Sequence, residues 1–239
     1  HLYRLVQLDS LVERGVFFSR WAPELAYGYG YPIFNYYAPA VYYVAEIFHL
    51  LGLSFTAALR ATFALALIVM AIAMYAWIRD LFNPAAALVA ASAYVAAPYM
   101  MILLVYRGAL AELAALALLP AVLWATHRFI MRGCSLYGAL GALLYALLIL
   151  THNITAMLFT VLLLGYGLCL AMDGWLRSAE RMWGRIGAVL LRVTFVVGLG
   201  LGLSCFFWLP ALAERNLVNI HQLYLPAALR FDANFVELS

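Results

Sequence analysis

Lysine is absent from this chain, and charge of either sign is scarce. All 14 basic residues are arginine, and charged residues make up 10% of the 239 residues, against about 25% in soluble domains. Arginine binds phosphate in a bidentate geometry, so the bias suits a phosphate-bearing ligand, but a GC-rich genome produces the same bias. The three cysteines show no CxxC spacing, so we expect small buried residues and not a disulfide or metal framework.

Several familiar catalytic motifs are also missing. The sequence has no GxxxxGK[ST], HExxH, GxSxG or dinucleotide-binding glycine pattern, and its five histidines are scattered. ATP-driven transport and zinc hydrolysis are therefore poor candidates, and we expect no nucleic-acid partner. The chain does not begin with Met, and no hydrophobic span precedes residue 20, so we expect it to be part of a longer protein.

Long hydrophobic runs are what the chain has in abundance. Hydrophobic residues make up 68% of it, and the mean hydropathy is +0.97, which predicts an all-α, polytopic membrane protein. We divide the chain into an external segment (1–56), a transmembrane bundle (57–210) and the start of another external segment (211–239). The bundle is predicted to hold about six spans, at 57–78, 84–105, 108–127, 135–151, 154–172 and 188–210.

Two helices are predicted before the first span, and neither is suited to cross a membrane. Residues 1–15 form an amphipathic pattern that ends at Gly15 and is too polar to span a bilayer. Residues 39–52 are apolar, but they are fewer than the roughly 20 that a span needs, and they include Glu46 and His49. We therefore expect two membrane-parallel helices. The apolar side of the first is formed by Leu2, Leu5, Leu8, Leu11 and Val12.

The positions of the arginines predict how the chain is oriented in the membrane. The turn 128–134 holds two arginines and no acid, and the loop 173–185 holds three arginines against two acids. Both belong on the cytoplasmic side, because short cytoplasmic loops are enriched in basic residues. Six alternating spans then place Arg107, the turn 152–153 and the tail from Ala211 outside.

The segment 20–43 is rich in aromatic residues, with seven Tyr, three Pro and two Gly. We call its part before residue 39 the aromatic loop. Tyr and Trp favour the membrane–water boundary, and Gly and Pro fix bends that a helix forbids. The segment lies on the external side if residues 39–52 do not cross the membrane. We interpret it as one wall of a binding site, the alternative being an aromatic belt that only anchors the first helix. Its candidate binding residues are Arg20, Trp21, Glu24, Tyr27, Tyr29, Tyr31 and Asn35.

Glu112 lies about one turn inside an apolar predicted helix, in the segment YRGALAE. A carboxylate within a membrane is costly, so its presence there points to function. The alternative is a structural ion pair with Arg107 or Arg60. Arg107 is also a candidate binding residue.

Two more polar groups are expected on the same face. His152 and Asn153 occupy the tip of a predicted helical hairpin, where they either take part in a site or serve as ordinary hydrogen-bonding turn residues. Glu214 follows the last span and faces either the site or only water.

The first 80 residues resemble the GT-C class of integral-membrane glycosyltransferases. The shared elements are an amphipathic helix ending at Gly15, the sequence Trp21-Ala22-Pro23, the aromatic loop, an interfacial helix closing at Gly52, and Arg60 at the start of the next span. In addition, RWAPELAYGYGYPIFNYYAP, YRGALAE, THN and FWLPALAE look like bacterial membrane proteins labelled 6-pyruvoyl-tetrahydropterin synthase-related. Nothing in the chain resembles a soluble pterin synthase.

The GT-C resemblance implies transfer of a sugar from a polyprenyl phosphate to an acceptor, on the external face of a bacterial plasma membrane. It places the catalytic acid at or just before His1, outside this sequence. Asp9, Glu112 and His152 are the weaker catalytic candidates within it. Membrane lipids and a polyprenyl-phosphate-linked sugar are the expected partners. The resemblance requires no cofactor, but it is compatible with a divalent metal ion.

The same resemblance assigns roles to the binding residues. Arg20 or Arg107 would hold phosphate. Trp21, Tyr27, Tyr29 and Tyr31 would stack on sugar or lipid. His152, Asn153 and Glu112 would orient the acceptor or a metal-bound phosphate. The alternative function is a lipid-carrier transporter or a membrane scaffold. Transport predicts breaks and polar groups near mid-membrane, and Pro98 and Pro120 are the only mid-span breakers in the sequence.

Overall fold

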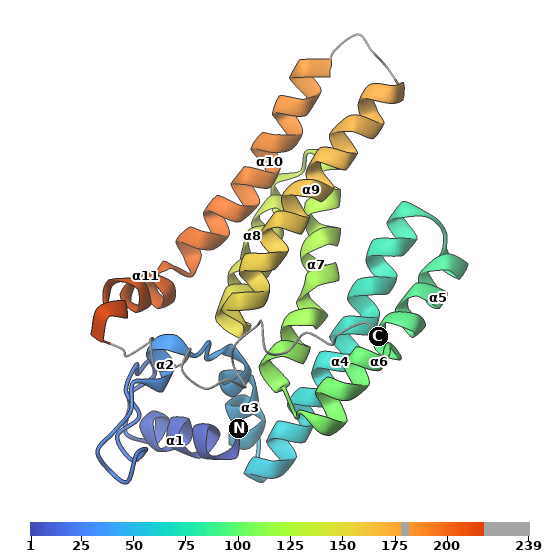
Figure 1. Ribbon diagram of the computed structural model, residues 1–239. Helices are drawn as coiled ribbons and strands as arrows, with labels where there is room; N and C mark the ends of the chain where they lie inside the picture. Colours follow the sequence, from blue (N-terminus) through green and yellow to red (C-terminus); the bar gives the residue numbers. More distant parts are fainter. Residues whose placement is uncertain (178–181, 218–239) are drawn as a thin grey trace, which may run out of the picture.

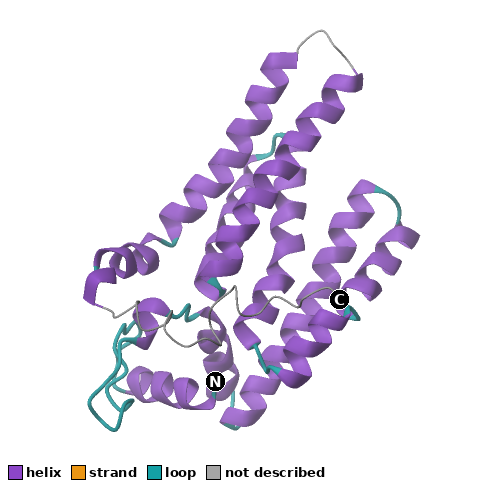
Figure 2. Ribbon diagram, in the orientation of Figure 1, coloured by secondary structure: helices purple, strands orange, loops and turns teal. Residues whose placement is uncertain are grey.

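The regular elements in the described part of the chain are helices. The computed structural model describes residues 1–177 and 182–217, and within these ranges it shows helices joined by turns and loops (Figures 1 and 2). The β-type contact in the described part is an isolated bridge between Ala22 and Tyr31. The all-α prediction is confirmed for these residues.

The observed helices lie close to the segments that hydropathy predicts, with differences at two places discussed below. In chain order they are α1 (Leu2–Glu13), α2 (Ile33–Tyr36), α3 (Ala40–Leu50), α4 (Phe55–Leu81), α5 (Pro84–Val95), α6 (Pro98–Met101), the π-helix η1 (Ile102–Tyr106), α7 (Leu110–Arg132), α8 (Ser135–Thr151), α9 (Asn153–Arg177), α10 (Met182–Leu203), α11 (Cys205–Ala213) and the 3₁₀ turn η3 (Arg215–Leu217).

Four helices in the described part are long and apolar enough to cross a membrane: α4, α7, residues Asn153–Met172 of α9 and residues Ile186–Leu203 of α10. A fifth span results if α5 and Pro98–Tyr106 are counted together as one helix bent by 41°. The expected span 135–151 coincides with α8, whose 17 residues are at the lower limit for a span. The chain is a polytopic helical membrane protein, and its described residues hold four or five spans by length, against the six expected from hydropathy.

The expected span 84–105 is interrupted at Ala97. Proline lacks a backbone N–H and disfavours the helical region for the residue before it, and Ala97 has φ −57° and ψ 137°. The chain then turns through α6 into η1. Pro120, the other expected breaker, lies inside α7, which continues through it.

The span expected over 188–210 is shorter in the structure: α10 contains a candidate span at Ile186–Leu203, and the chain breaks at Ser204 before a second helix, α11. α10 ends at Leu203, and the buried hydroxyl of Ser204 donates a hydrogen bond to the Gly200 carbonyl at 2.9 Å. The indole of Trp208 in α11 donates to the Leu201 carbonyl at 2.9 Å, which ties α11 to the end of α10. Hydropathy does not reveal the break, since both helices are apolar.

The bundle is a row of neighbouring helices in which α4 packs on α7, α7 on α8, and α8 on α10 (Figure 1). Its core includes the fully buried side chains of Val122, Leu148 and Val193. Gly200 of α10 lies against Tyr145 of α8, so the two helices approach closely there.

We expect Gly200→Ala to destabilise the bundle by about 1–3 kcal/mol, because it would overpack this contact. A Cβ at Gly200 would lie 2.6 Å from the Tyr145 ring and 2.9 Å from the Ala142 carbonyl oxygen. Gly198→Ala is the matched control, since nothing lies within 4 Å of its Cβ position. Thermal unfolding in nanodiscs tests the pair, and equal melting temperatures for the two variants would contradict close packing at Gly200.

α1, α2 and α3 gather at one end of the bundle, which we call the loop end (Figure 1). α1 packs on α3 and α4 through Leu5, Leu8 and Leu11, all buried, as their helical spacing predicts. The start of α7 is held at the same end, because the His1 side chain hydrogen-bonds to the Gly108 carbonyl at 2.8 Å. The loop end therefore collects segments that lie far apart in the sequence.

Candidate functional site

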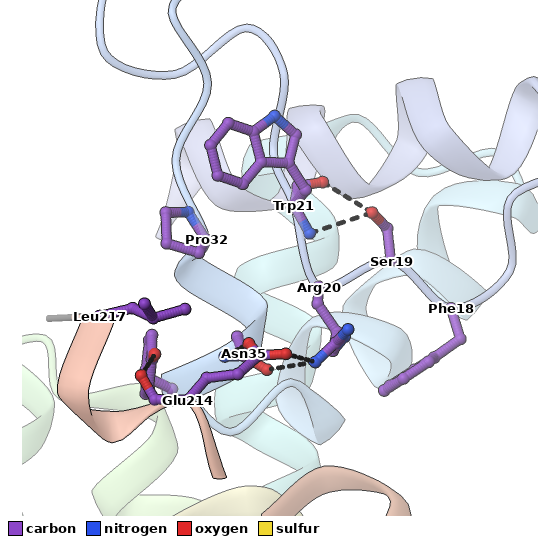
Figure 3. Close-up of a pocket in the computed structure, with 9 residues that line it drawn as sticks. Phe18, Ser19, Arg20, Trp21, Pro32, Asn35, Glu214 and Leu217 are labelled. Carbon is purple, nitrogen blue, oxygen red and sulfur yellow. Dashed lines mark hydrogen bonds and ion pairs between the residues drawn. The ribbon is translucent and has the colours of Figure 1, made fainter. Parts of the chain in front are cut away.

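A cavity of about 530 Å³ lies at the loop end, between the aromatic loop and the end of α11. It is open on one side, and both charged and aromatic side chains line it (Figure 3). The lining residues are Phe18, Ser19, Arg20, Trp21, Pro32, Asn35, Tyr36, Glu214 and Leu217.

Glu214 is the point at which the two sides of the cavity meet. Arg20 donates from Nη1 to Glu214 Oε1 at 2.8 Å, and the buried amide of Asn35 donates to Glu214 Oε2 at 2.9 Å (Figure 3). Arg20 Nη1 also contacts Asn35 Oδ1 at 3.3 Å, and the Tyr36 hydroxyl donates to the Glu214 backbone carbonyl at 3.0 Å. Of the two sequence-based alternatives for Glu214, the structure favours the one in which it faces the cavity.

The aromatic loop is shaped so that Arg20 and Trp21 line this cavity. Ala22 and Tyr31 exchange two backbone hydrogen bonds, of 2.8 and 2.9 Å, which close the loop into a narrow turn. Gly30 has φ +81°, and a Cβ there would lie 2.3 Å from the Trp21 indole. Only glycine fits this conformation and this close approach, so Gly30 allows the indole to pack across the loop.

Tyr27, Tyr29 and Tyr31 do not line the cavity. Tyr27 and Tyr29 lie at the tip of the loop and are almost fully exposed, at 103% and 88%, and Tyr31 is about half exposed. Ala26 and Tyr27 both have positive φ, so the backbone turns sharply at the tip. The structure therefore separates these three candidate binding residues from Arg20 and Trp21.

Glu24 and Asp9 also lie away from the cavity. Glu24 accepts a hydrogen bond from Arg14 of α1 at 3.0 Å, and its backbone N–H donates to Gln7 Oε1 at 3.0 Å. Asp9 lies 3.7 Å from His49 of α3. Both acids join α1 to neighbouring segments.

A second polar cluster lies where the bent span meets α7. Arg107 Nη1 and Glu112 Oε2 form an ion pair of 3.0 Å, and the Tyr99 hydroxyl donates to Glu112 Oε1. Of the two ion pairs considered from the sequence, Glu112 makes the one with Arg107, while Arg60 is exposed on α4. The cluster thus connects α6, the turn after η1 and the first turn of α7.

His152 and Asn153 form the turn between α8 and α9, as expected. Thr155 donates from its hydroxyl to His152 Nδ1 at 2.8 Å and from its backbone N–H to the same atom at 3.3 Å. Burial lowers the pKa of His152 below its usual value, so the neutral imidazole is favoured. Asn153 lines a different cavity of about 390 Å³, with Trp208 on its wall. Neither residue lines the cavity that contains Glu214.

Comparison with protein families gives one match. The model of the family described as 6-pyruvoyl-tetrahydropterin synthase related domain, a membrane protein, matches residues 34–224. The chain belongs to this family. No curated protein and no solved structure matches the chain. Within the cavity, the family match includes Asn35 and Glu214 and leaves out Arg20 and Trp21.

This family member also has an aromatic and cationic cluster around the buried Tyr42 at the loop end, which the sequence pattern did not indicate. Arg4 lies 4.0 Å from the centre of the Tyr37 ring and donates to the Tyr42 hydroxyl at 2.9 Å. Tyr42 in turn bonds to His1 Nδ1 at 2.7 Å, and burial raises the pKa of its phenol. Arg4 could have been suspected, because a helical wheel places it beside the buried Leu5 and Leu8.

The described part of the chain holds no cluster of side chains that would form a metal-binding cage by itself. Within residues 1–177 and 182–217, no three His, Cys, Asp or Glu side chains converge in a metal-binding arrangement. Glu112 and Glu214 are each paired with an arginine. The candidate site offers one arginine, one amide and one carboxylate, which bond to one another.

Proposed function

We propose that this protein transfers a sugar from a polyprenyl phosphate to an acceptor hydroxyl in the cavity at the loop end. The observation that carries the proposal is the convergence of Arg20, Asn35 and Glu214 in an open cavity of about 530 Å³ with Trp21 on its wall. A lipid-linked sugar phosphate needs a cation for the phosphate, an aromatic face for the sugar, and a carboxylate to accept a proton. This one cavity supplies all three groups.

In the proposed reaction the acceptor oxygen attacks the anomeric carbon of the sugar, and its proton passes to the Glu214 carboxylate. The bond between the anomeric carbon and the phosphate oxygen breaks, and polyprenyl phosphate leaves with the electron pair. Arg20 and Asn35 stabilise the charge that develops on the leaving phosphate. Substrate binding would therefore draw Arg20 from Glu214 toward the phosphate.

The proposed external location of the loop end rests on the arginines of the short turns at the opposite end. Arg79 lies at the end of α4, and Arg128 and Arg132 lie at the end of α7. Basic residues near span ends favour the cytoplasmic side. The other arginine-rich loop of the sequence-based argument, 173–185, includes residues 178–181, which lie outside the described residues.

Binding of the donor tests the proposal. The full-length protein in nanodiscs would be titrated with a polyprenyl-phosphate sugar and, separately, with free polyprenyl phosphate. We expect Arg20→Ala to raise the Kd for both about 10- to 100-fold, since a hydrogen bond to a charged group contributes about 1.5–3 kcal/mol. Arg14→Ala is the matched control, because Arg14 is also an exposed arginine paired with a glutamate but lines no part of the cavity. Absence of binding by the folded wild type would refute the proposal.

A second candidate function, transport of a lipid carrier, is favoured by the bent span. Transporter sites are often built where helices are discontinuous, and π-helical turns are frequent at functional sites. Here the bend of 41° and η1 lie beside the ion pair of Arg107 and Glu112. Proteoliposomes with a fluorescent polyprenyl-phosphate sugar separate the two functions: movement between leaflets without any transferred product would favour transport.

A further inference from the structure

Glu46 of α3 is a buried acid that the proposed reaction does not use. Its side chain is 3% exposed, and among the described residues neither carboxylate oxygen has a hydrogen-bond partner. Burial of an ionised carboxylate without a donor or a cation is strongly unfavourable. The position therefore requires either a positive partner or a bound proton.

The residue that faces Glu46 from α1 is another acid. Asp9 lies 3.7 Å from His49, which is one turn along α3 from Glu46, so α1 brings the Asp9 charge to the part of α3 that carries Glu46, and Glu13 of the same helix adds further negative charge. Two deprotonated carboxylates offer only acceptors, so they cannot hydrogen-bond to each other. One proton placed between them turns this repulsive contact into an O–H···O hydrogen bond.

Neighbouring groups do not supply the missing donor in the described part of the chain. His49 uses Nδ1–H to donate to the Leu53 carbonyl at 2.7 Å, and its ring stacks on Phe55. Its other nitrogen, Nε2, lies 3.7 Å from Asp9, which is too long for a hydrogen bond. On the other helices that pack against α3, Arg60 is exposed, and Glu112 is paired with an arginine.

We propose that Asp9 and Glu46 form a proton-binding site, in which one proton shared by the two carboxyl groups fixes the amphipathic helix α1 on α3. Loss of this proton leaves two negative charges in the buried contact and weakens the docking of α1. The site is independent of the proposed sugar transfer, since neither acid lines the cavity at Glu214.

The sign of the pH dependence follows from the direction of the shift. Burial and the charge of Asp9 raise the pKa of Glu46 above its usual value. The folded protein therefore binds more protons than the unfolded chain at pH values between the unfolded-state and folded-state pKa of this group. The free energy of unfolding must fall as the pH rises through that interval.

Thermal unfolding of the full-length protein in nanodiscs, from about pH 5 to about pH 8, tests the site. We expect the acid pair to make the wild-type Tm fall as the pH rises, against the opposite contribution of His152, whose lowered pKa adds stability at higher pH. Glu46→Gln should flatten this fall and raise the Tm at the alkaline end by about 2–4 °C, and Asp9→Asn should flatten it as well. Glu24→Gln, at an exposed acid, is the matched control and should keep the wild-type slope.

Two further results would overturn the site. If His49→Gln alone removed the slope, the proton would belong to the histidine and not to the acid pair. Difference infrared spectra provide a direct measurement that does not depend on stability: at neutral pH the wild type should show the carbonyl band of a protonated carboxylic acid, and Asp9→Asn should alter it. A wild-type spectrum without this band would refute the proposal even if Glu46→Gln failed to fold.

Discussion

Glu214→Gln is expected to lower the rate of sugar transfer by about 100-fold or more, because general-base catalysis contributes roughly 10²- to 10⁴-fold. The amide keeps the size of the side chain and can still accept a hydrogen bond from Arg20, which lies 2.8 Å from Glu214 Oε1. It cannot accept a proton from the acceptor hydroxyl. Single-turnover transfer from a polyprenyl-phosphate sugar, at saturating donor, measures the chemical step directly.

The donor affinity of Glu214→Gln should remain within about threefold of wild type, because Arg20 and Asn35 stay in place to bind phosphate. Glu112→Gln is the control, since Glu112 is another arginine-paired carboxylate at the loop end but does not line the cavity. Transfer by Glu214→Gln at the wild-type rate would show that Glu214 is not the base. A loss confined to Glu112→Gln would place the chemistry at the bent span.

Hydropathy was sufficient for the fold class and for most helix positions, because a membrane span is a local property of about 20 residues. α8 has the predicted limits, and α1 and α3 fall within the two predicted surface segments. The pattern failed where a break depends on a single contact. The separation of α11 from α10 rests on Ser204 and Trp208, whose hydrogen bonds do not alter an apolar window.

Sequence reasoning predicted which candidate residues share one face of the protein, but it could not predict which of them contact one another. Alternation of spans placed Arg20, Asn35 and Glu214 on one face, but it could not show that a carboxylate 194 residues away in sequence bonds to Arg20. Tyr27, Tyr29 and Tyr31 were grouped with Arg20 because they are close to it in sequence. The bridge between Ala22 and Tyr31 instead projects the loop tip away from the cavity, which is a property of backbone geometry.

The largest effect on stability is expected at the opposite end of the bundle, where Asp80 of α4 binds Arg128 of α7. Arg128 donates from Nη2 to Asp80 Oδ1 at 3.0 Å and from Nε to Asp80 Oδ2 at 2.5 Å, and the Trp124 indole donates to the same Oδ2 at 2.9 Å. The two charged side chains are only 16% and 17% exposed. Asp80→Asn should cost about 3–5 kcal/mol, because it leaves the Arg128 charge largely buried without a counter-ion.

A double-mutant cycle separates the ion pair from the packing around it. If the charges are coupled, Asp80→Asn combined with Arg128→Met should cost less than the sum of the two single substitutions, because no uncompensated charge remains. Glu24→Gln, which breaks the exposed pair with Arg14, is the control and should cost less than about 1 kcal/mol. Thermal unfolding in nanodiscs gives all four corners of the cycle. Additive costs would show that Asp80 and Arg128 do not stabilise the packing of α4 on α7 through their charges, and that Arg128 is held there by its contacts with the Trp124 and Tyr137 rings, 4.8 and 5.4 Å away.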